Sequence, residues 1–330
     1  MTGLPTARRR AVPAGWVRCA TFNVLHGRLL GQDGRPPFAA AGGVRVPLAE
    51  AVASLDADVL ALQEVDRLQE RSGLLDQAAV AAEAMDARDW RYASALHGRP
   101  LPGQDWVVER AGPGLRVYGP RHRALGDGTP SHGVALLSRL PVRLWRARRL
   151  APAPCGLPLR VAGRPGLTTV RDQPRAALAA VLEGPAGPFT VVAVHLSFAP
   201  GWNIRQLLTV RRWIGDLPGP HVLLGDFNLI GALPAAVLNT ADLVQSWPHA
   251  PGRRRPGAGW RDLARTPTYP AHRPVVQFDH VLTSGIGAAA VAAVRAPRTA
   301  ISDHRPLVAE LRLTASAPCT PVGPARPTTR

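Results

Sequence analysis

The sequence contains no lysine, so all 40 of its basic residues are arginines, and 23 acidic residues leave a formal net charge of +17. A charge of this sign favours acidic partners such as nucleic acid or anionic lipid. Alanine, arginine, proline and glycine are all abundant, however, which suggests a GC-rich coding bias. Part of the charge can therefore belong to an ordinary solvated surface, and the charge alone leaves nucleic-acid binding open.

Cysteine is also scarce. Cys19, Cys155 and Cys319 are odd in number and far apart, so they predict neither a disulfide framework nor a zinc site. No apolar run approaches the length of a membrane span, and the charged N-terminus has no apolar stretch behind it of the kind that a signal peptide needs. We therefore expect a cytoplasmic monomer without stable membrane insertion.

With 330 residues and 46% hydrophobic content, the chain is long enough to bury a large core. Residues 1–15 are expected to form a flexible N-terminal arm. Residues 16–313 are expected to form one domain with the alternating strand and helix patterns of an α/β (α+β) protein. Residues 314–330 consist mainly of proline, threonine, alanine and arginine, and predict a disordered C-terminal tail.

Residues 97–131 form a long connection rich in glycine, proline and arginine. Connections of this length are uncommon in compact domains and are often functional or mobile. The segment mixes aromatic and basic groups: Trp106, Arg110, Arg116, Tyr118, Arg121, His122 and Arg123. It is either a loop that grips a substrate or a disordered insertion.

The most informative stretch is HVLLGDFNL, residues 221–229. Its apolar run predicts a buried strand, and Gly225 allows the backbone to turn or to approach a ligand. Asp226 and Asn228 are two residues apart and would point the same way if the extended backbone continued. A carboxylate beside a carboxamide can accept a proton from water and donate a hydrogen bond to an anion. The alternative is an Asp-x-Asn turn that only closes the strand.

Other predicted strands place polar groups in the same way. The strand at residues 16–24 carries Asn23 at its end, and the strand at residues 58–65 carries Glu64. The strand at residues 189–194 leads into His195, the strand at residues 277–282 carries Asp279, and the loop at residues 301–306 holds Asp303 and His304. We also predict two hairpins, residues 132–139 with 141–150 and residues 175–182 with 189–194. Because strand ends in layered α/β folds meet at one rim, the polar groups should converge there.

The order of motifs resembles the endonuclease/exonuclease/phosphatase superfamily. TFNVLHG, LQEVD, HGVALLSRLPV, VVAVHLS, LLGDFN, FDHVL and SDHRPLVAEL follow one another over residues 16–313, nearly the whole chain. Any one of these motifs is weak, but six or more in order form a specific signal. The resemblance implies a four-layer α/β/β/α sandwich with two mixed β-sheets packed face to face. It also implies hydrolysis of a phosphate ester with a divalent metal.

The residue types agree with that chemistry. Oxygen donors suit Mg²⁺ or Mn²⁺, and we expect Glu64 and Asp303 to bind the metal with help from Asn23. His304 titrates near neutral pH and is the preferred base, and the resemblance implies that Asp279 fixes its tautomer. The remaining expected roles are these: Asp226 orients or deprotonates the water, Asn228 and His195 hydrogen-bond the phosphoryl group, and Arg175 contacts phosphate or forms a structural salt bridge. Whether Asp226 or His304 takes the proton stays open.

The sequence departs from one branch of the superfamily. Apurinic-site endonucleases carry an aspartate where this chain has Leu25, and a tyrosine where it relies on His195. The two-histidine set is more similar to pancreatic deoxyribonuclease and to the sphingomyelinase and phosphoinositide phosphatase branches. Three functions therefore stay open: a nuclease or other phosphodiesterase, a phosphatase or phosphodiesterase for lipid head groups or small phosphorylated metabolites, and a catalytically inactive binding module. His26 can also lie near the site, whereas Asp66 is expected at the surface and His132 and His280 in structural or peripheral places.

Overall fold

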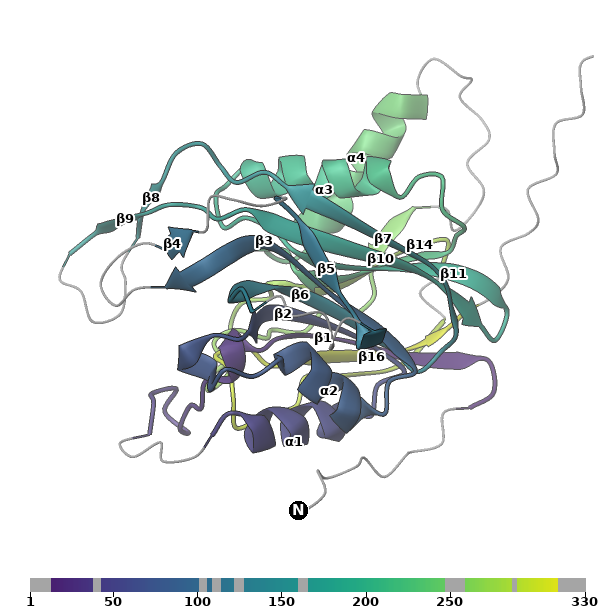
Figure 1. Ribbon diagram of the computed structural model, residues 1–330. Coiled ribbons are helices and arrows are strands. Elements are labelled where there is room, and N and C mark those ends of the chain that lie inside the picture. Colours follow the sequence, from purple (N-terminus) through teal and green to yellow (C-terminus); the bar gives the residue numbers. More distant parts are fainter. Residues whose placement is uncertain are drawn as a thin grey trace, which may run out of the picture.

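The computed structural model describes residues 13–37, 43–100, 106–108, 114–121, 128–159, 166–246, 259–286 and 290–313. Most of the expected N-terminal arm and the whole expected tail at 314–330 lie outside these ranges, as do Arg110, His122 and Arg123. Two mixed β-sheets stack face to face, with helices on both outer sides (Figure 1). The predicted four-layer sandwich is confirmed. No helix in the described part of the chain is both long and apolar enough to cross a membrane.

The first sheet has mixed pairing, with β1 parallel to β2 and antiparallel to β16. Its strand order is β15 (Val291–Arg295), β16 (Leu307–Arg312), β1 (Trp16–Asn23), β2 (Val59–Arg67), β6 (Ser131–Ser138), β3 (Asp89–Pro100) and β4 (Trp106–Val108), with β5 (Arg116–Tyr118) also paired to β3. The helices α1 (Arg45–Leu55) and α2 (Gln77–Met85) cover its outer face (Figure 1).

The second sheet is built around the parallel pair of β11 and β12. Its order is β13 (Trp260–Asp262), β14 (Asp279–Ser284), β12 (His221–Asp226), β11 (Gly187–His195), β10 (Arg175–Gly184) and β7 (Val142–Leu150). The helices α3 (Trp202–Trp213) and α4 (Leu233–Ser246) cover its outer face (Figure 1). Shorter elements are the pair of β8 (Leu157–Leu159) and β9 (Thr168–Val170) and the 3₁₀ turns η1 (Leu25–Gly27) and η2 (Glu70–Ser72).

Apolar side chains from the facing sides of the two sheets form the central layer of the core. Val17, Ala61, Leu178, Val191 and Leu224 are representative, and each is almost fully buried. Such interdigitation fixes the separation of the two sheets at about 10 Å. The rims of the two sheets are therefore held at a fixed distance from each other, which matters because polar groups from both sheets meet there.

One predicted hairpin is correct and the other is wrong. β10 pairs with β11 as expected, but β6 does not pair with β7. The second half of β6 is an apolar, buried run, and the strand lies between β2 and β3, whereas the arginine-rich β7 lies at the edge of the second sheet. Charged strands suit a sheet edge because their side chains stay solvated. The chain therefore crosses from one sheet to the other between residues 138 and 142.

Gly225 lies in β12 directly beside Val194 of β11. A Cβ at residue 225 would lie 2.0 Å from the backbone oxygen of Val194, so the close approach is to a neighbouring strand. The Gly225→Ala variant is expected to lose about 1–3 kcal/mol of unfolding free energy, because the strands must move apart. Urea denaturation measures the loss. Gly43→Ala is the matched control, since a Cβ there meets nothing within 4 Å. Equal stability of the two variants would contradict the conclusion that the close approach of β11 requires glycine at this position.

Candidate active site

The strand register brings three of the predicted polar residues side by side. His195 ends β11 and Asp226 ends the parallel strand β12, and these two residues are partners in register. Asp279 begins β14, which runs antiparallel to β12, and is the register partner of Asp226 from the other side. The carboxyl ends of parallel strands share one edge of a sheet, and an antiparallel neighbour starts at that edge. The second sheet therefore presents a row of one imidazole and two carboxylates.

Asn23 links this row to the first sheet. It ends β1 and is almost fully buried. Its Nδ2 donates to Asp226 Oδ2 at 3.1 Å and to Glu64 Oε1 at 3.1 Å. The two sheets thus meet at a shared polar centre that neither of them could form alone.

Glu64 occupies an irregular position in β2. Its φ is +55°, in the left-handed region that a residue with a Cβ seldom adopts. The pairing with β6 shifts between Leu62 and Val65, which marks a β-bulge around this residue. Bulges re-aim side chains and are frequent beside active sites. Here the bulge brings the carboxylate to Asn23.

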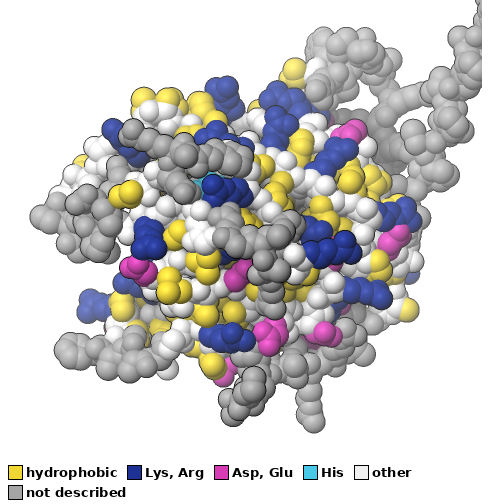
Figure 2. Space-filling model, in the orientation of Figure 1, with side chains coloured by type: hydrophobic (Ala, Val, Ile, Leu, Met, Phe, Trp, Pro, Cys, Tyr) yellow, Lys and Arg dark blue, Asp and Glu magenta, His cyan; other side chains and the backbone are white. Residues whose placement is uncertain are grey.

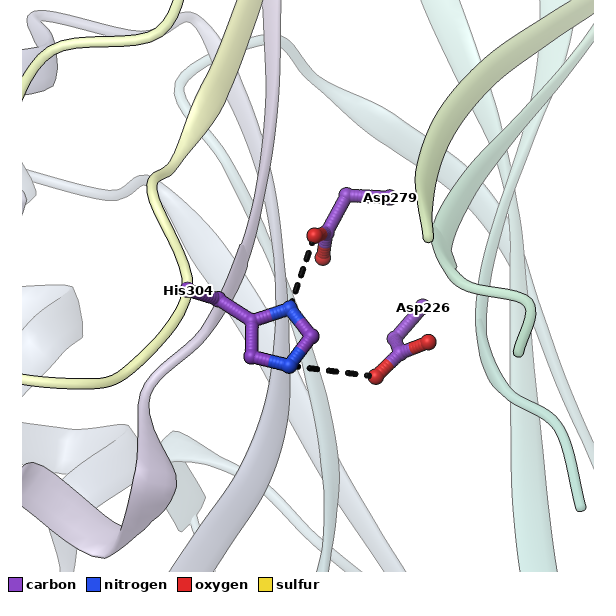
Figure 3. Close-up of side chains that lie close together, drawn as sticks. All are labelled: Asp226, Asp279 and His304. Atoms are coloured by element: carbon purple, nitrogen blue, oxygen red, sulfur yellow. Dashed lines mark hydrogen bonds and ion pairs between the residues drawn. The ribbon is translucent and has the colours of Figure 1, made fainter. Parts of the chain in front are cut away.

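His304 approaches Asp226 from the loop before β16, and Asp279 holds its ring (Figure 3). His304 Nδ1 lies 2.8 Å from Asp279 Oδ2, and Thr268 Oγ1 donates to the same oxygen at 2.6 Å. An ionised carboxylate only accepts hydrogen bonds, so Nδ1 carries the proton of this pair. The other ring nitrogen, Nε2, faces Asp226.

Two imidazoles point at one carboxylate oxygen without bonding to it. His195 Nε2 lies 3.8 Å from Asp226 Oδ2, and His304 Nε2 lies 3.9 Å from the same atom. Both distances exceed the length of a hydrogen bond. They suit groups that share an oxygen atom lying between them, such as that of water or of a phosphoryl group.

Burial and mutual charge set the protonation of these groups. Burial alone would lower the pKa of His304, but Asp279 and two further carboxylates outweigh it and raise that pKa to about 10. Burial raises the pKa of Asp226 to about 6 in spite of the opposing charge of His304. Burial and the Arg175 guanidinium hold the pKa of His195 well below its ordinary value. At neutral pH the site therefore holds a carboxylate, an imidazolium and a neutral imidazole.

The metal-ligand candidates carry competing charges. Burial would raise the pKa of Glu64, but His132 and the Asn23 hydrogen bond outweigh it and lower that pKa. Burial raises the pKa of Asp303, and the nearby Glu64 carboxylate raises it further against the pull of His304. Two mutually repelling carboxylates suit a hard divalent cation, which would relieve their repulsion. The donor chemistry of Glu64, Asp303 and Asn23 therefore fits Mg²⁺ or Mn²⁺.

A second group of ligand atoms lies nearby. One ligand atom each from Asp226, Asp279 and His304 lie within 4.8 Å of one another. Asp279 Oδ2 and His304 Nδ1 are already bonded to each other, however, and Asp279 Oδ1 is a buried acceptor without a partner among the described residues. A cation bound in this group would have to use Oδ1 or displace the histidine.

Asn228 and Arg175 lie at the border of the centre. The Asn228 amide N–H donates to Asp226 Oδ1 at 2.9 Å and its side-chain Nδ2 donates to the Leu196 carbonyl at 3.0 Å. Its φ of +48° shows that the backbone turns after Asp226 instead of staying extended, so the Asp-x-Asn turn is present within the cluster. Arg175 Nη1 lies 3.0 Å from His195 Nδ1, and Arg175 Nη2 lies 3.8 Å from Asp172.

The sequence interpretation missed Asp66. This carboxylate is fully buried and not at the surface. It accepts two 2.8 Å hydrogen bonds from Arg71 and lies 2.7 Å from His132 Nδ1. The bulge at Glu64 breaks the two-residue alternation of β2, so the burial of Asp66 could not be read from the strand pattern. The nearest signal in the sequence was its position two residues after Glu64.

Comparisons with known proteins agree with this architecture. The model of the Endonuclease/Exonuclease/phosphatase family matches residues 20–304. An endonuclease/exonuclease/phosphatase from Beutenbergia cavernae DSM 12333 is 23% identical, with 91% of this chain and 72% of that chain covered and a TM-score of 0.51. One from Bacteroides vulgatus is 17% identical, with 90% and 99% covered and a TM-score of 0.52.

ANGEL2, a 2′,3′-cyclic phosphatase, is 14% identical, with 89% of this chain and 94% of that chain covered and a TM-score of 0.50. No curated protein matches the sequence. At these identities the solved structures share the fold with this chain, and the family assignment rests on the match over residues 20–304.

Proposed function

The chain belongs to the endonuclease/exonuclease/phosphatase family, and on that premise we propose that it is a divalent-metal-dependent hydrolase of phosphate esters. The observation that carries the proposal is the space around Asp226 Oδ2, which two imidazole Nε2 atoms face at 3.8 and 3.9 Å. An attacking water and a phosphoryl oxygen can share this space. The reaction is a direct attack of water on phosphorus, in which the P–O bond to the alcohol breaks and no covalent enzyme intermediate forms.

Asp226 is the better proton acceptor of the two candidates. Its pKa of about 6 leaves it ionised at neutral pH, whereas a pKa of about 10 keeps His304 protonated. Of the two assignments that the sequence left open, these pKa values favour a division of roles. Asp226 takes the proton of water, and His304, held by Asp279, donates a hydrogen bond to the phosphoryl oxygen as its negative charge grows.

The other residues orient the phosphoryl group. His195, neutral and in contact with Arg175, supplies a further polar group 3.8 Å from Asp226 Oδ2. Asn228 holds the Asp226 carboxylate through its backbone N–H, so its contribution to phosphoryl binding is secondary. A divalent cation held by Glu64 and Asp303 with Asn23 would neutralise phosphate charge and stabilise the leaving oxygen.

Removal of the metal is expected to abolish turnover. With methyl p-nitrophenyl phosphate as a generic ester, a chelator should stop hydrolysis and added Mg²⁺ or Mn²⁺ should restore it. The Glu64→Gln variant, which loses a ligand charge, should need about tenfold or more metal for half-maximal activity. Glu70→Gln is the matched control, because Glu70 is exposed and pairs with Arg99. Metal-independent turnover, or equal metal titrations for the two variants, would contradict the metal assignment.

Nucleic acid is a second candidate substrate because of the net charge of +17. Figure 2 shows arginine side chains spread over this face among hydrophobic and acidic ones. If DNA or RNA is the substrate, its binding should weaken steeply as salt is raised. Absence of turnover of any phosphate ester with either metal would favour the third possibility, an inactive binding module.

A further inference from the structure

A pocket of about 220 Å³ opens beside the proposed catalytic centre. It shares Glu64, Arg175 and His195 with that centre, but Asp226, Asp279 and His304 do not line it. The rest of its polar and aromatic wall comes from segments to which the proposed reaction assigns no role: His26, Arg71, Trp106, His132 and Gln173.

In phosphoryl transfer the attacking and leaving oxygens lie roughly in line on opposite sides of phosphorus. Asp226, which takes the proton of water, lies outside the pocket, and Glu64, which would hold the metal beside the leaving oxygen, lies in its wall. We propose that this pocket binds the leaving alcohol of the substrate and selects a single hydroxylated ring, as in the phosphate ester of a sugar or cyclic polyol. The inference rests on the proposed function and adds the substrate class to it.

Asp66 organises the wall of this pocket. Its bonds with Arg71 use Nε and Nη2 of the guanidinium, and no hydrogen bond between described residues uses Nη1. The same carboxylate holds His132, and Arg71 Nη2 also lies 3.2 Å from His132 Nδ1. A guanidinium fixed on two sides presents its remaining N–H groups in one geometry, which favours recognition of defined hydroxyl positions.

Two buried polar atoms of residues that line the pocket, His26 Nδ1 and Arg175 Nε, lack partners among the described residues. Both atoms are closed to solvent, so they do not form the accessible wall of the pocket. Buried polar atoms of this kind are rare in folded proteins and are commonly satisfied by water. Recognition of hydroxyl groups therefore depends on the other polar groups of the lining, such as Arg71 and His132.

The pocket favours a neutral ring over a second phosphate. The Arg71 guanidinium is already paired with the buried Asp66, and Asp172 lies 3.8 Å from the Arg175 guanidinium. The cationic charge available to an additional anion is therefore small, although both arginines can still donate hydrogen bonds. Trp106 adds an apolar ring to the wall, 5.3 Å from the Arg71 guanidinium and 5.6 Å from the His132 ring. Aromatic faces suit the C–H surface of a sugar or cyclitol ring.

The volume of the pocket matches a small group. Pockets for drug-sized ligands occupy about 300–1,000 Å³, and this one is smaller at about 220 Å³. A single six-membered ring with hydroxyls fits this volume. The pocket therefore suits the alcohol part of a small phosphate ester.

The experiment compares kcat/KM for phosphate esters of myo-inositol and of ethanol, each as the monoester and as the methyl diester. We expect the wild-type protein with Mg²⁺ or Mn²⁺ to prefer an inositol ester over the matching ethyl ester by about tenfold or more, because truncated substrates lose transition-state contacts. Arg71→Met should reduce this preference to about twofold or less. Arg99→Met is the matched control, since Arg99 is exposed, pairs with Glu70 and does not line the pocket.

Trp106→Ala is the second variant, because Arg71→Met leaves the buried Asp66 with fewer partners and can reduce stability. It should also lower the inositol preference, with a thermal midpoint close to that of the wild type. A wild-type preference near one, an unchanged preference in both variants, or faster hydrolysis of duplex DNA than of every small ester would overturn the inference. Turnover of p-nitrophenyl phosphate, a monoester, and of methyl p-nitrophenyl phosphate, a diester, reports on the proposed function separately, because loss of turnover of both would contradict phosphate ester hydrolysis itself.

Discussion

Replacement of His304 with alanine is expected to lower kcat by about 10²–10⁴-fold. The variant loses the imidazolium that faces Asp226 Oδ2, and with it the hydrogen bond that we assign to the phosphoryl oxygen in the transition state. Steady-state kinetics on methyl p-nitrophenyl phosphate with saturating metal measures the effect. The loss should fall on kcat more than on KM, since the contact strengthens only as charge develops.

The matched control is His221→Ala. His221 begins the strand that Asp226 ends, so it lies at the far end of β12, where its ring stacks on Trp260. This variant should keep kcat within about twofold of the wild type at a temperature below its melting midpoint. If His304→Ala retained a near-native kcat while remaining folded, the assignment of the catalytic centre would be wrong.

The Asp226→Asn variant should lose about 10³-fold or more in kcat and also change the pH profile. Asp226 must be ionised to accept a proton, so the wild-type rate should rise as pH increases through about 6, the pKa of this carboxyl. It should fall again near pH 10, where His304 loses the proton that it donates. Asparagine does not titrate, so the rise near pH 6 should be absent from the residual activity of the variant.

Asp216→Asn is the control for this change, because Asp216 is an exposed carboxylate paired with Arg146. Its pH profile should match that of the wild type. A wild-type rate that continues to rise up to pH 10 would contradict the division of roles, since it would identify neutral His304 as the proton acceptor. In that case, the rate of the Asp226→Asn variant should also still rise with pH on the acidic side of its profile.

The positions of the central strands could be predicted because short apolar runs have few places to go except a buried sheet. β1, β2, β11 and β12 follow such runs, and each ends near the polar residue that the sequence marked. Asn23, His195 and Asp226 then meet because the strands that carry them are neighbours or face each other across the core. The roles of these residues stay predictions for the experiments above.

Other features, such as strand pairing and the burial of single polar residues, depend on tertiary contacts that the local sequence does not reveal. β6 and β7 are adjacent in the chain and both prone to form strands. β6, which is mostly buried, lies inside the first sheet, whereas the arginine-rich β7 lies at the edge of the second. Asp66 is buried because Arg71 and His132 gather around it, and neither partner is marked by spacing. The long connection at residues 97–131 contributes Trp106 to the pocket beside the proposed catalytic centre.

The last strand of the first sheet, β16, pairs with the first strand, β1, and His304 lies just before it. A chain that ends before residue 304 therefore lacks both the imidazole and the whole of β16. On the proposed mechanism, a chain that ends before residue 304 should therefore have little hydrolytic activity.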